Sequence, residues 1–170
     1  SEHATLAFTL TYSSTCPCSA ALSRHAIQEK FHEDFLNNTT FSKDEIIHWL
    51  GKEESICATP HSQRSKATLT FSINPSEPLS INKFIQGAEH TLQTAVQTAV
   101  KRIDEKEFAL QNASHLMFCE DAGRKLKSSL TNDDRVKDFW VRVEHHESLH
   151  AHNAVSVFTK GVEDGYLPIP

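Results

Sequence analysis

Residues 4–19 read ATLAFTLTYSSTCPCS, and this stretch decides how the fold begins. Apolar and polar side chains alternate along its first half, which is the pattern of a strand with one buried face. The strand is predicted to end at a turn formed by residues 13–15 and to present Cys16 at its end. Because Pro17 has a fixed φ and restricts the residue before it to an extended backbone, Cys16 and Cys18 are expected on a stiff turn.

The pattern after this strand predicts a mixed fold. Apolar residues recur at the helical period from residue 80 to residue 100, which predicts one long amphipathic helix, and Ser42 with Glu45 has capping-box spacing at the start of a shorter helix. The charged run 101–106 is placed at the end of the long helix. The expected helices are 20–35, 42–50, 80–100 and 113–130, and the expected strands are 4–12, 66–73, 136–144 and 152–159.

This order predicts an α+β fold: a four-stranded antiparallel sheet with two long helices on one face. The 170 residues are interpreted as a single domain, with residues 20–58 as a helical insertion after the first strand. Such a sheet has open edges, and pairing of edges between subunits would remove them, so a homo-oligomer is expected.

Composition limits the possible functions. The formal net charge of -5 argues against a nucleic-acid binder, which needs a basic face. No stretch is long and apolar enough to cross a bilayer and no secretion signal is visible, so a cytoplasmic protein without a membrane partner is expected. In that compartment the 4 cysteines are expected as reduced thiols or metal ligands rather than disulfides. The 11 histidines favour metal or proton chemistry.

The Cys-Pro-Cys turn and His61 suggest a mixed metal site with sulfur, nitrogen and oxygen donors. Both Cys16 and His61 lie just outside predicted strand ends. Glu105 is a possible third ligand, although the charged run around it has the pattern of a solvated helix terminus.

Two further acidic positions have chemical potential. Glu120 follows an apolar helical stretch, where it is either half buried and able to transfer protons or exposed one step around from the core stripe. If the segment 147–152 is extended, His150 and His152 share one face. Glu147 can accept two donors at once, as from the edge of a guanine-like ring. The alternative is a polar hairpin whose histidines face water.

Together these segments resemble the GTP cyclohydrolase IB family, metal-dependent enzymes of the tunnelling fold. The resemblance extends from residue 16 to residue 152 with the motifs in the family's order. The matching motifs are Cys16-Pro17-Cys18-Ser19, His61-Ser62-Gln63-Arg64-Ser65, Lys101-Arg102-Ile103-Asp104-Glu105-Lys106, Phe118-Cys119-Glu120-Asp121 with Arg124, and Glu147-Ser148-Leu149-His150-Ala151-His152.

The resemblance implies that the chain opens the guanine ring of GTP at C8 and forms formate and 7,8-dihydroneopterin triphosphate, for folate or for a modified tRNA base. It implies one divalent metal ion, Zn, Mn or Fe, in a homo-oligomer expected to be a tetramer. The implied metal ligands are Cys16, His61 and Glu105. The implied catalytic residues are Glu120, His150, His152 and Cys18, where Cys18 either tunes the site or forms a redox-labile pair with Cys16. The implied contact to guanine is Glu147. The candidate contacts to the triphosphate, chosen by their positive charge and their position near the motifs, are Arg64, Lys101, Arg102 and Arg124.

The chain departs from the family pattern in three respects. A strand-rich first module is expected upstream in family members, so this chain is expected to correspond to the C-terminal part of a longer protein. The insertion separates Cys16 from His61 widely. Ser62 and Ile103 stand where Asn and Pro are expected, but neither change removes a ligand.

Two alternatives use the same residues differently. In a nitrile reductase of the same fold, acting on a deazaguanine, the cysteine would be a nucleophile, and His61 and Glu105 would have no role. In a non-catalytic zinc module the site would be closed by four protein ligands, and Cys18 would have to join Cys16.

Overall fold

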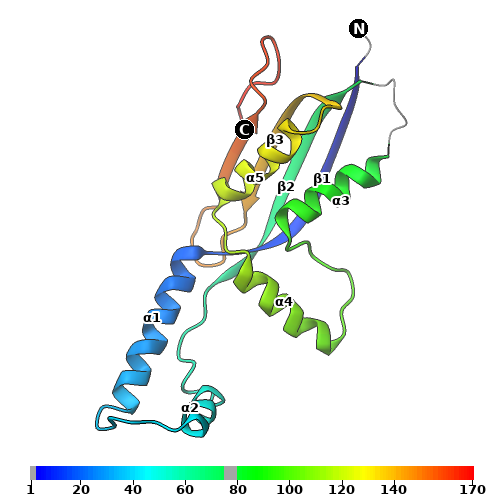
Figure 1. Ribbon diagram of the computed structural model, residues 1–170. Helices are drawn as coiled ribbons and strands as arrows, with labels where there is room; N and C mark the ends of the chain where they lie inside the picture. Colours follow the sequence, from blue (N-terminus) through cyan, green and yellow to red (C-terminus); the bar gives the residue numbers. More distant parts are fainter. Residues whose placement is uncertain (1–2, 75–79) are drawn as a thin grey trace. The chain divides into compact units, whose positions relative to one another are not determined.

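The computed structural model describes residues 3–74 and 80–170, which form two compact units. Unit 1 combines the N-terminal segment up to Thr15 with Ser62–Pro170, and unit 2 is Cys16–His61. The two connections between them leave unit 1 at Thr15 and Ser62, which are paired across neighbouring strands. Figure 1 shows the elements of both units.

Unit 1 contains a four-stranded antiparallel sheet in the order β1-β2-β3-β4. Its strands are β1 (Ala4–Thr15), β2 (Ser62–Ile73), β3 (Val136–His145) and β4 (Ala154–Thr159). The strands alternate as predicted, with buried residues on one face and exposed or partly exposed residues on the other. Each strand follows its predecessor in space, so the sheet is a meander.

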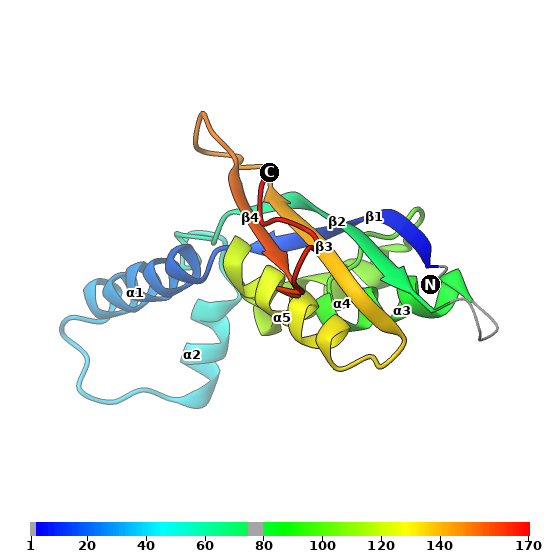
Figure 2. The ribbon, with the colours of Figure 1, turned by 90° about the horizontal axis from the view of Figure 1, so that it is seen from above.

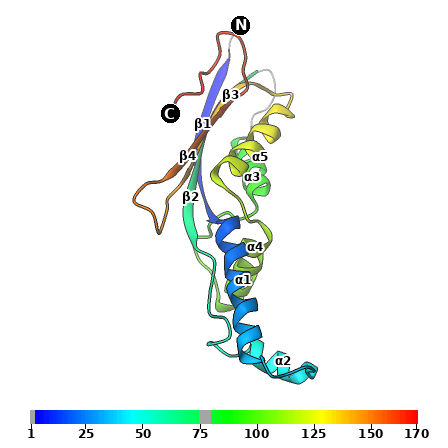
Figure 3. The same ribbon diagram turned by 90° about the vertical axis from the view of Figure 1, so that its left-hand side faces the viewer.

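Three helices of unit 1 lie on one face of this sheet, as the two views of Figures 2 and 3 show. They are α3 (Ile81–Leu92), α4 (Arg102–Ser114) and α5 (Cys119–Thr131). The apolar core is between the sheet and this layer, and α3 and α5 supply its helical side. Its buried members include Leu69, Phe71, Phe84, Leu92, Leu126, Phe139 and Val141. The predicted α+β class with helices on one face of an antiparallel sheet is confirmed.

The prediction of one helix from residue 80 to residue 100 is wrong. Helix α3 ends at Leu92, Gln93 adopts a left-handed conformation with φ 67°, and the chain then runs beside β1. Ser13 N donates to Thr94 O at 2.9 Å, and Val96 N donates to Thr11 O at 3.1 Å. The backbone of this segment therefore pairs with the edge of the sheet in place of further helical turns.

This break also changes the position of the charged run 101–106. The run opens α4 and does not close the preceding helix. Lys101 N donates to Asp104 Oδ2 at 2.7 Å, which caps the new helix at its N-terminus. The last helix likewise begins at Cys119 and not at residue 113, because 102–114 is a separate helix and the residues between are not helical.

Three strand boundaries also differ from the prediction. β1 continues through the expected turn to Thr15, because Ser13, Ser14 and Thr15 pair with the start of β2. β2 accordingly begins at Ser62. The last strand begins at Ala154, and residues 146–153 before it form a loop and no strand.

Unit 2 contains two helices, α1 (Pro17–Asp34) and α2 (Lys43–Leu50). The predicted capping box is confirmed: Glu45 N donates to Ser42 Oγ at 3.2 Å, and Ser42 N donates to Glu45 Oε2 at 2.8 Å. Helix α1 starts three residues earlier than predicted, because Pro17 is favourable in the first turn of a helix. An aromatic cluster joins the helices and is formed by Phe31, Phe35, Phe41 and Trp49.

Within residues 3–74 and 80–170, none of the helices combines the length and the apolar character that a membrane span requires.

Candidate functional site

Several of the motif residues of unit 1 gather at one end of its sheet. There β1 ends, β2 begins with Ser62, and β3 ends at His145. The residues before α5 join this end, since Met117 N donates to Thr15 O at 3.2 Å. The antiparallel topology thus brings together segments that are far apart in the sequence.

A buried polar pair supports this end of the sheet from the inside. Tyr12 Oη and His145 Nε2 are 2.9 Å apart, and both residues are almost completely buried. Burial lowers the pKa of His145 to about 4, against a smaller opposing effect of the Glu120 and Asp121 carboxylates. Burial also raises the pKa of Tyr12. Both side chains are therefore neutral at pH 7.

The start of α5 is fixed to the β3–β4 hairpin by Cys119. Its buried thiol lies 3.3 Å from Val143 O and 3.4 Å from Ser156 Oγ, and Ser156 Oγ donates to Cys119 O at 3.1 Å. Burial raises the pKa of this thiol. Cys119 is thus a structural contact that sets the position of the next residue, Glu120.

Glu120 itself is exposed, so the hypothesis that it is half buried is wrong. Its place in the first turn of α5 is electrostatically favourable for a carboxylate, because the helix N-terminus carries a partial positive charge. An exposed carboxylate at this position is accessible to a ligand.

The carboxylate of Glu147 has one occupied and one unoccupied oxygen. Gln63 Nε2 donates to Glu147 Oε1 at 3.4 Å. Glu147 Oε2 is buried and has no hydrogen-bond partner within the described part of the chain. Asn153 Oδ1 accepts from Glu147 N at 3.2 Å, which fixes the backbone at the same residue. A buried acceptor without a partner is unfavourable unless a ligand or water supplies a donor.

The two histidines of the same loop lie against each other. The rings of His150 and His152 are stacked, with centroids 5.7 Å apart and an interplanar angle of 17°. The loop is not a strand, so their proximity arises from the loop conformation and not from the alternation that predicted it. Both residues are exposed.

The three predicted metal ligands are divided between the two units. In unit 2, Cys16 N donates to His61 O at 3.4 Å, and His61 N donates to Ser19 Oγ at 3.1 Å. Cys16 has the extended backbone that was predicted before Pro17, and Cys18 is exposed in the first turn of α1. All 4 cysteines are free thiols.

Glu105 belongs to unit 1, where it is exposed on α4. No group of three His, Cys, Asp or Glu side chains close enough to hold a metal ion occurs among the residues that the structure describes. A thiolate, an imidazole and a carboxylate nevertheless form a chemically suitable donor set for a divalent ion.

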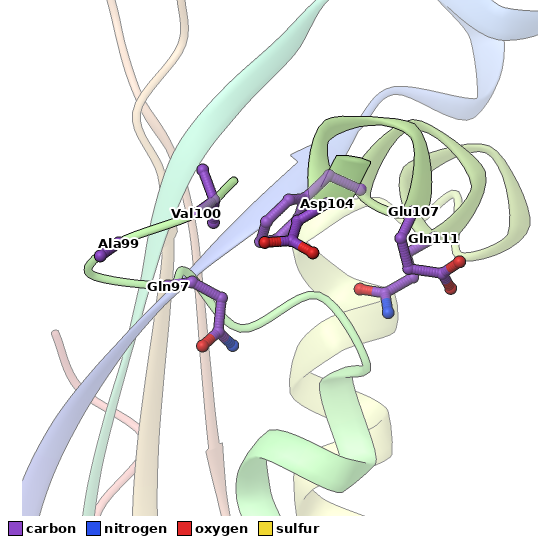
Figure 4. A pocket seen from close by; sticks show the side chains of 7 residues that line it. Gln97, Ala99, Val100, Asp104, Glu107 and Gln111 are labelled. Carbon is purple, nitrogen blue, oxygen red and sulfur yellow. The ribbon is translucent and has the colours of Figure 1, made fainter. Parts of the chain in front are cut away.

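Helix α4 also borders a pocket of about 300 Å³, shown in Figure 4. Gln97 and Val100, from the segment between α3 and α4, lie on one side, and Asp104, Glu107 and Gln111 of α4 lie on the other. Its lining is mixed, with two carboxylates and two amides beside the apolar Val100 and Phe108. Sequence patterns did not indicate it, because it depends on the break after α3.

The predicted triphosphate contacts occupy different places in unit 1. Arg64 is exposed at the start of β2, and Lys101 and Arg102 are exposed at the start of α4. Arg124 forms an ion pair with Asp121 on the same helix.

Sequence reasoning missed the side chains that support Glu147 and the sheet end. Gln63 was part of a quoted motif but had no assigned role, and Asn153 was not singled out. Tyr12 was assigned only to a strand, and His145, which follows the predicted strand 136–144, had no role of its own. Alternation does place Tyr12 and His145 on buried faces, but their pairing depends on strand register, which the pattern of one strand does not specify.

Comparisons with known proteins agree with these motifs. Residues 1–156 match the family model described as type I GTP cyclohydrolase folE2. The protein named GTP cyclohydrolase FolE2 of Hydrogenovibrio crunogenus is 50% identical over 165 residues, which cover 97% of this chain and 53% of that protein. The protein of the same name from Chromohalobacter salexigens is 51% identical over 154 residues, which cover 90% of this chain and 50% of that protein. The protein of that name from Pseudoalteromonas translucida is 48% identical over 162 residues, which cover 95% of this chain and 53% of that protein. The chain spans about half the length of these curated relatives.

Proposed function

Since the chain belongs to the type I GTP cyclohydrolase folE2 family, we propose that it catalyses hydrolytic opening of the guanine ring of GTP. Water attacks C8 of the purine, formate is released, and the product is 7,8-dihydroneopterin triphosphate. The observed α+β architecture agrees with the tunnelling fold of such enzymes. The names of the curated relatives support this assignment over the nitrile-reductase and zinc-module alternatives.

The observation that carries the proposal is the environment of Glu147. Its Oε2 is a buried acceptor without a partner among the described residues, next to a carboxylate oxygen that Gln63 already contacts. Guanine presents two adjacent donors, the N1 hydrogen and the 2-amino group, and a carboxylate is the side chain that accepts both. Glu147 therefore binds and orients the guanine edge.

Glu120, His150 and His152 are the proton-transfer residues in this proposal. Glu120 moves a proton between the attacking water and the ring nitrogen that is released when the C8–N bond breaks. The stacked pair His150 and His152 lies in the same loop as Glu147, which supports a role for both in the same site. The exposed cations Arg64, Lys101 and Arg102 are assigned to the triphosphate, and Arg124 joins them only if it leaves Asp121.

We assign Cys16, His61 and Glu105 to a divalent ion, Zn, Mn or Fe, on the correspondence of their motifs with those of the family. The backbone contact between Cys16 and His61 supports two of the three ligands. When bound, the ion would supply Lewis-acid activation of the water. Cys18, two residues after Cys16, is assigned to tuning this site.

A homo-oligomer is part of the proposal, with a tetramer expected from the resemblance. β4 is an edge strand of the sheet, and Val155 on it is 41% exposed. Pairing of such an edge with a second copy would satisfy its backbone groups. Sedimentation equilibrium measures the number of copies directly, and a monomer at micromolar concentration would contradict this part.

Activity is tested by incubating the 170-residue chain with GTP and Zn, Mn or Fe under reducing conditions. The expected products are formate and a pterin that fluoresces after oxidation. Glu147→Ala should lower kcat/KM at least ~100-fold, because it removes a charged contact to the substrate. Leu149→Ala is the matched control, since Leu149 is in the same loop and 71% exposed. Absence of product with every metal would refute the activity.

Metal binding is tested separately from activity. Cys16→Ser should lower the bound zinc per chain and weaken its affinity at least ~10-fold in a chelator competition, because a hydroxyl replaces a thiolate ligand. Cys57→Ser is the control, since Cys57 is an exposed thiol of the same unit. Equal zinc binding by wild type and Cys16→Ser would exclude Cys16 as a ligand.

A further inference from the structure

The side chain of Gln63 lies at the point where a rigid part of the sheet meets the candidate guanine contact. We propose that Gln63 is a positioning residue that holds the Glu147 carboxylate in the orientation needed to distinguish guanine from purines that lack the 2-amino group. The proposal rests on the proposed function, because it concerns how Glu147 recognises its ligand.

Gln63 is held firmly by its neighbours in β2. It is 7% exposed, and it is paired with Ser14 in the ladder between β1 and β2. Two residues further on, Ser65 is fully buried and its Oγ lies 2.7 Å from Ser14 Oγ. A buried side chain on a central strand has few alternative conformations, so its amide is a fixed donor.

The fixed amide restricts the carboxylate. Gln63 Nε2 donates to Glu147 Oε1 at 3.4 Å, and this contact joins residues 84 positions apart in the sequence. With Oε1 engaged, rotation of the carboxylate about its last bond is restricted. Glu147 Oε2, buried and without a partner within the described residues, then has a defined direction.

The backbone of Glu147 is fixed independently. Asn153 Oδ1 accepts from Glu147 N at 3.2 Å, and Asn153 Nδ2 donates to Glu144 Oε1 at 3.4 Å. Glu144 also pairs with Arg142 on β3. The two ends of the 146–153 loop are therefore tied together through Asn153, and the amides of Gln63 and Asn153 fix the side chain and the main chain of Glu147 respectively.

This arrangement has a consequence for specificity. A ligand with two adjacent donors gains most when both carboxylate oxygens are already oriented, because no rotational freedom is then lost on binding. Hypoxanthine lacks the 2-amino donor and gains less. Loss of the Gln63 amide should therefore weaken the binding of GTP more than the binding of inosine triphosphate.

The test compares GTP and inosine triphosphate by calorimetric titration of the zinc-loaded 170-residue chain. The wild type should bind GTP more tightly. In Gln63→Met, which keeps the length and removes the donor, the ratio of the two affinities should fall about tenfold, as expected for loss of one hydrogen bond to a charged group. In Gln63→Glu the affinity ratio should fall further, because a carboxylate oxygen then faces the Glu147 carboxylate and neither supplies a donor.

Two further variants keep the result interpretable. Gln63→Asn retains a buried amide that is one methylene too short, so it serves if Gln63→Met does not fold. Thr68→Val on the same strand is the matched control, because Thr68 contacts Thr9 on the opposite face of the sheet and should leave the ratio unchanged.

The outcomes separate this inference from the proposed function. A wild type that does not distinguish the two nucleotides refutes the guanine contact of Glu147 and the inference with it. If the wild type and Gln63→Met discriminate equally while Glu147→Ala does not, Glu147 is the contact and the inference about Gln63 is wrong. An equal loss of affinity for both nucleotides in Gln63→Met assigns it a merely structural role and also overturns the inference.

Discussion

Tyr12 and His145 show how a single buried pair links sequence to stability. His145 is 3% exposed and hydrogen-bonded to the phenol of Tyr12, so its neutral form is the one that fits the folded chain. Protonation would place a charge in the interior, where, among the residues that the structure describes, no carboxylate is in ion-pair contact with it. The Glu120 and Asp121 carboxylates favour protonation only weakly from a distance.

The pH dependence of stability follows from this histidine. Its pKa is about 4 in the folded chain and about 6.5 when unfolded, so the unfolded state binds more protons between these values. The contribution is complete above pH 6.5 and is lost as the pH falls toward 4. It amounts to about 3 kcal/mol. Carboxyl groups with a lowered pKa, such as Glu144 beside Arg142, act only at lower pH.

Urea unfolding measured from pH 7.5 to 4.5 checks this prediction. The free energy of unfolding should decrease as the pH falls from 6.5 to 4.5. In the double variant Tyr12→Phe with His145→Phe, most of this dependence of the unfolding free energy on pH should be lost. His32→Gln, at an exposed position, should keep the slope of the wild type. A wild type whose stability is constant from pH 6.5 to 4.5 would contradict burial of a neutral His145.

At the scale of elements, the position of α5 depends on a glycine. A Cβ added at Gly123 would lie 2.1 Å from Phe158 Cε2 and 3.1 Å from Ser156 Oγ, so any other residue separates α5 from β4. The same contact region includes Cys119 and Ser156. Glu120 lies beside Cys119 in the first turn of α5. Its position therefore depends on the close approach of α5 to β4 at Gly123.

Gly123→Ala should destabilise the chain by ~1–3 kcal/mol, because the added methyl group overpacks the contact with Phe158. Gly87→Ala is the matched control in α3, where an added Cβ meets nothing within 4 Å. That substitution should stabilise the chain by about 0.5–1 kcal/mol through helix propensity. Chemical denaturation of the two variants measures both effects, and a neutral Gly123→Ala would show that α5 can shift freely.

The short helix α2 depends on its capping box. Ser42→Ala removes the acceptor for Glu45 N and should cost ~1 kcal/mol of local stability. Ser80→Ala is the control, since Ser80 occupies the N-cap of α3 without a side-chain cap hydrogen bond to the described residues. Amide exchange of residues 43–50 is the measurement. Unchanged protection in Ser42→Ala would mean that the aromatic contacts alone hold α2.

At the scale of the whole molecule, the two units differ in what they need for folding. The main apolar core belongs entirely to unit 1. Unit 2 has its own aromatic cluster, in which Trp49 Nε1 also donates to Asp34 Oδ2 at 2.9 Å. The connections to unit 2 start from neighbouring residues, since Thr15 Oγ1 and Ser62 Oγ are 2.7 Å apart.

Unit 1 should therefore fold without unit 2. Replacing residues 16–61 by Asn-Gly converts β1 and β2 into a hairpin with a two-residue turn, which suits antiparallel neighbours. The shortened chain should retain cooperative thermal unfolding and the near-ultraviolet circular dichroism of a packed core, while zinc binding is lost with Cys16 and His61. A shortened chain that is unfolded at 25 °C would show that the sheet depends on unit 2.

The sequence alone determined which faces of the strands are buried, the Ser42 cap and the set of motifs that places the chain in its family. These features are local, because alternation and capping depend on residues only a few positions apart. The register that brings Tyr12 to His145 and Gln63 to Glu147 is not local and was not predicted.

Only the tertiary structure decided that the helical stripe after residue 80 breaks at Gln93 and that β1 extends to Thr15. In both places, backbone groups of a neighbouring strand offered partners that competed with the local preference for a helix or a turn. It also decided that Glu147 keeps one buried oxygen without a partner in the described chain, since that depends on how the loop after β3 meets Gln63 of β2. Periodicity specifies which side of a helix or strand is apolar, but long-range pairing specifies which residues pack against that side.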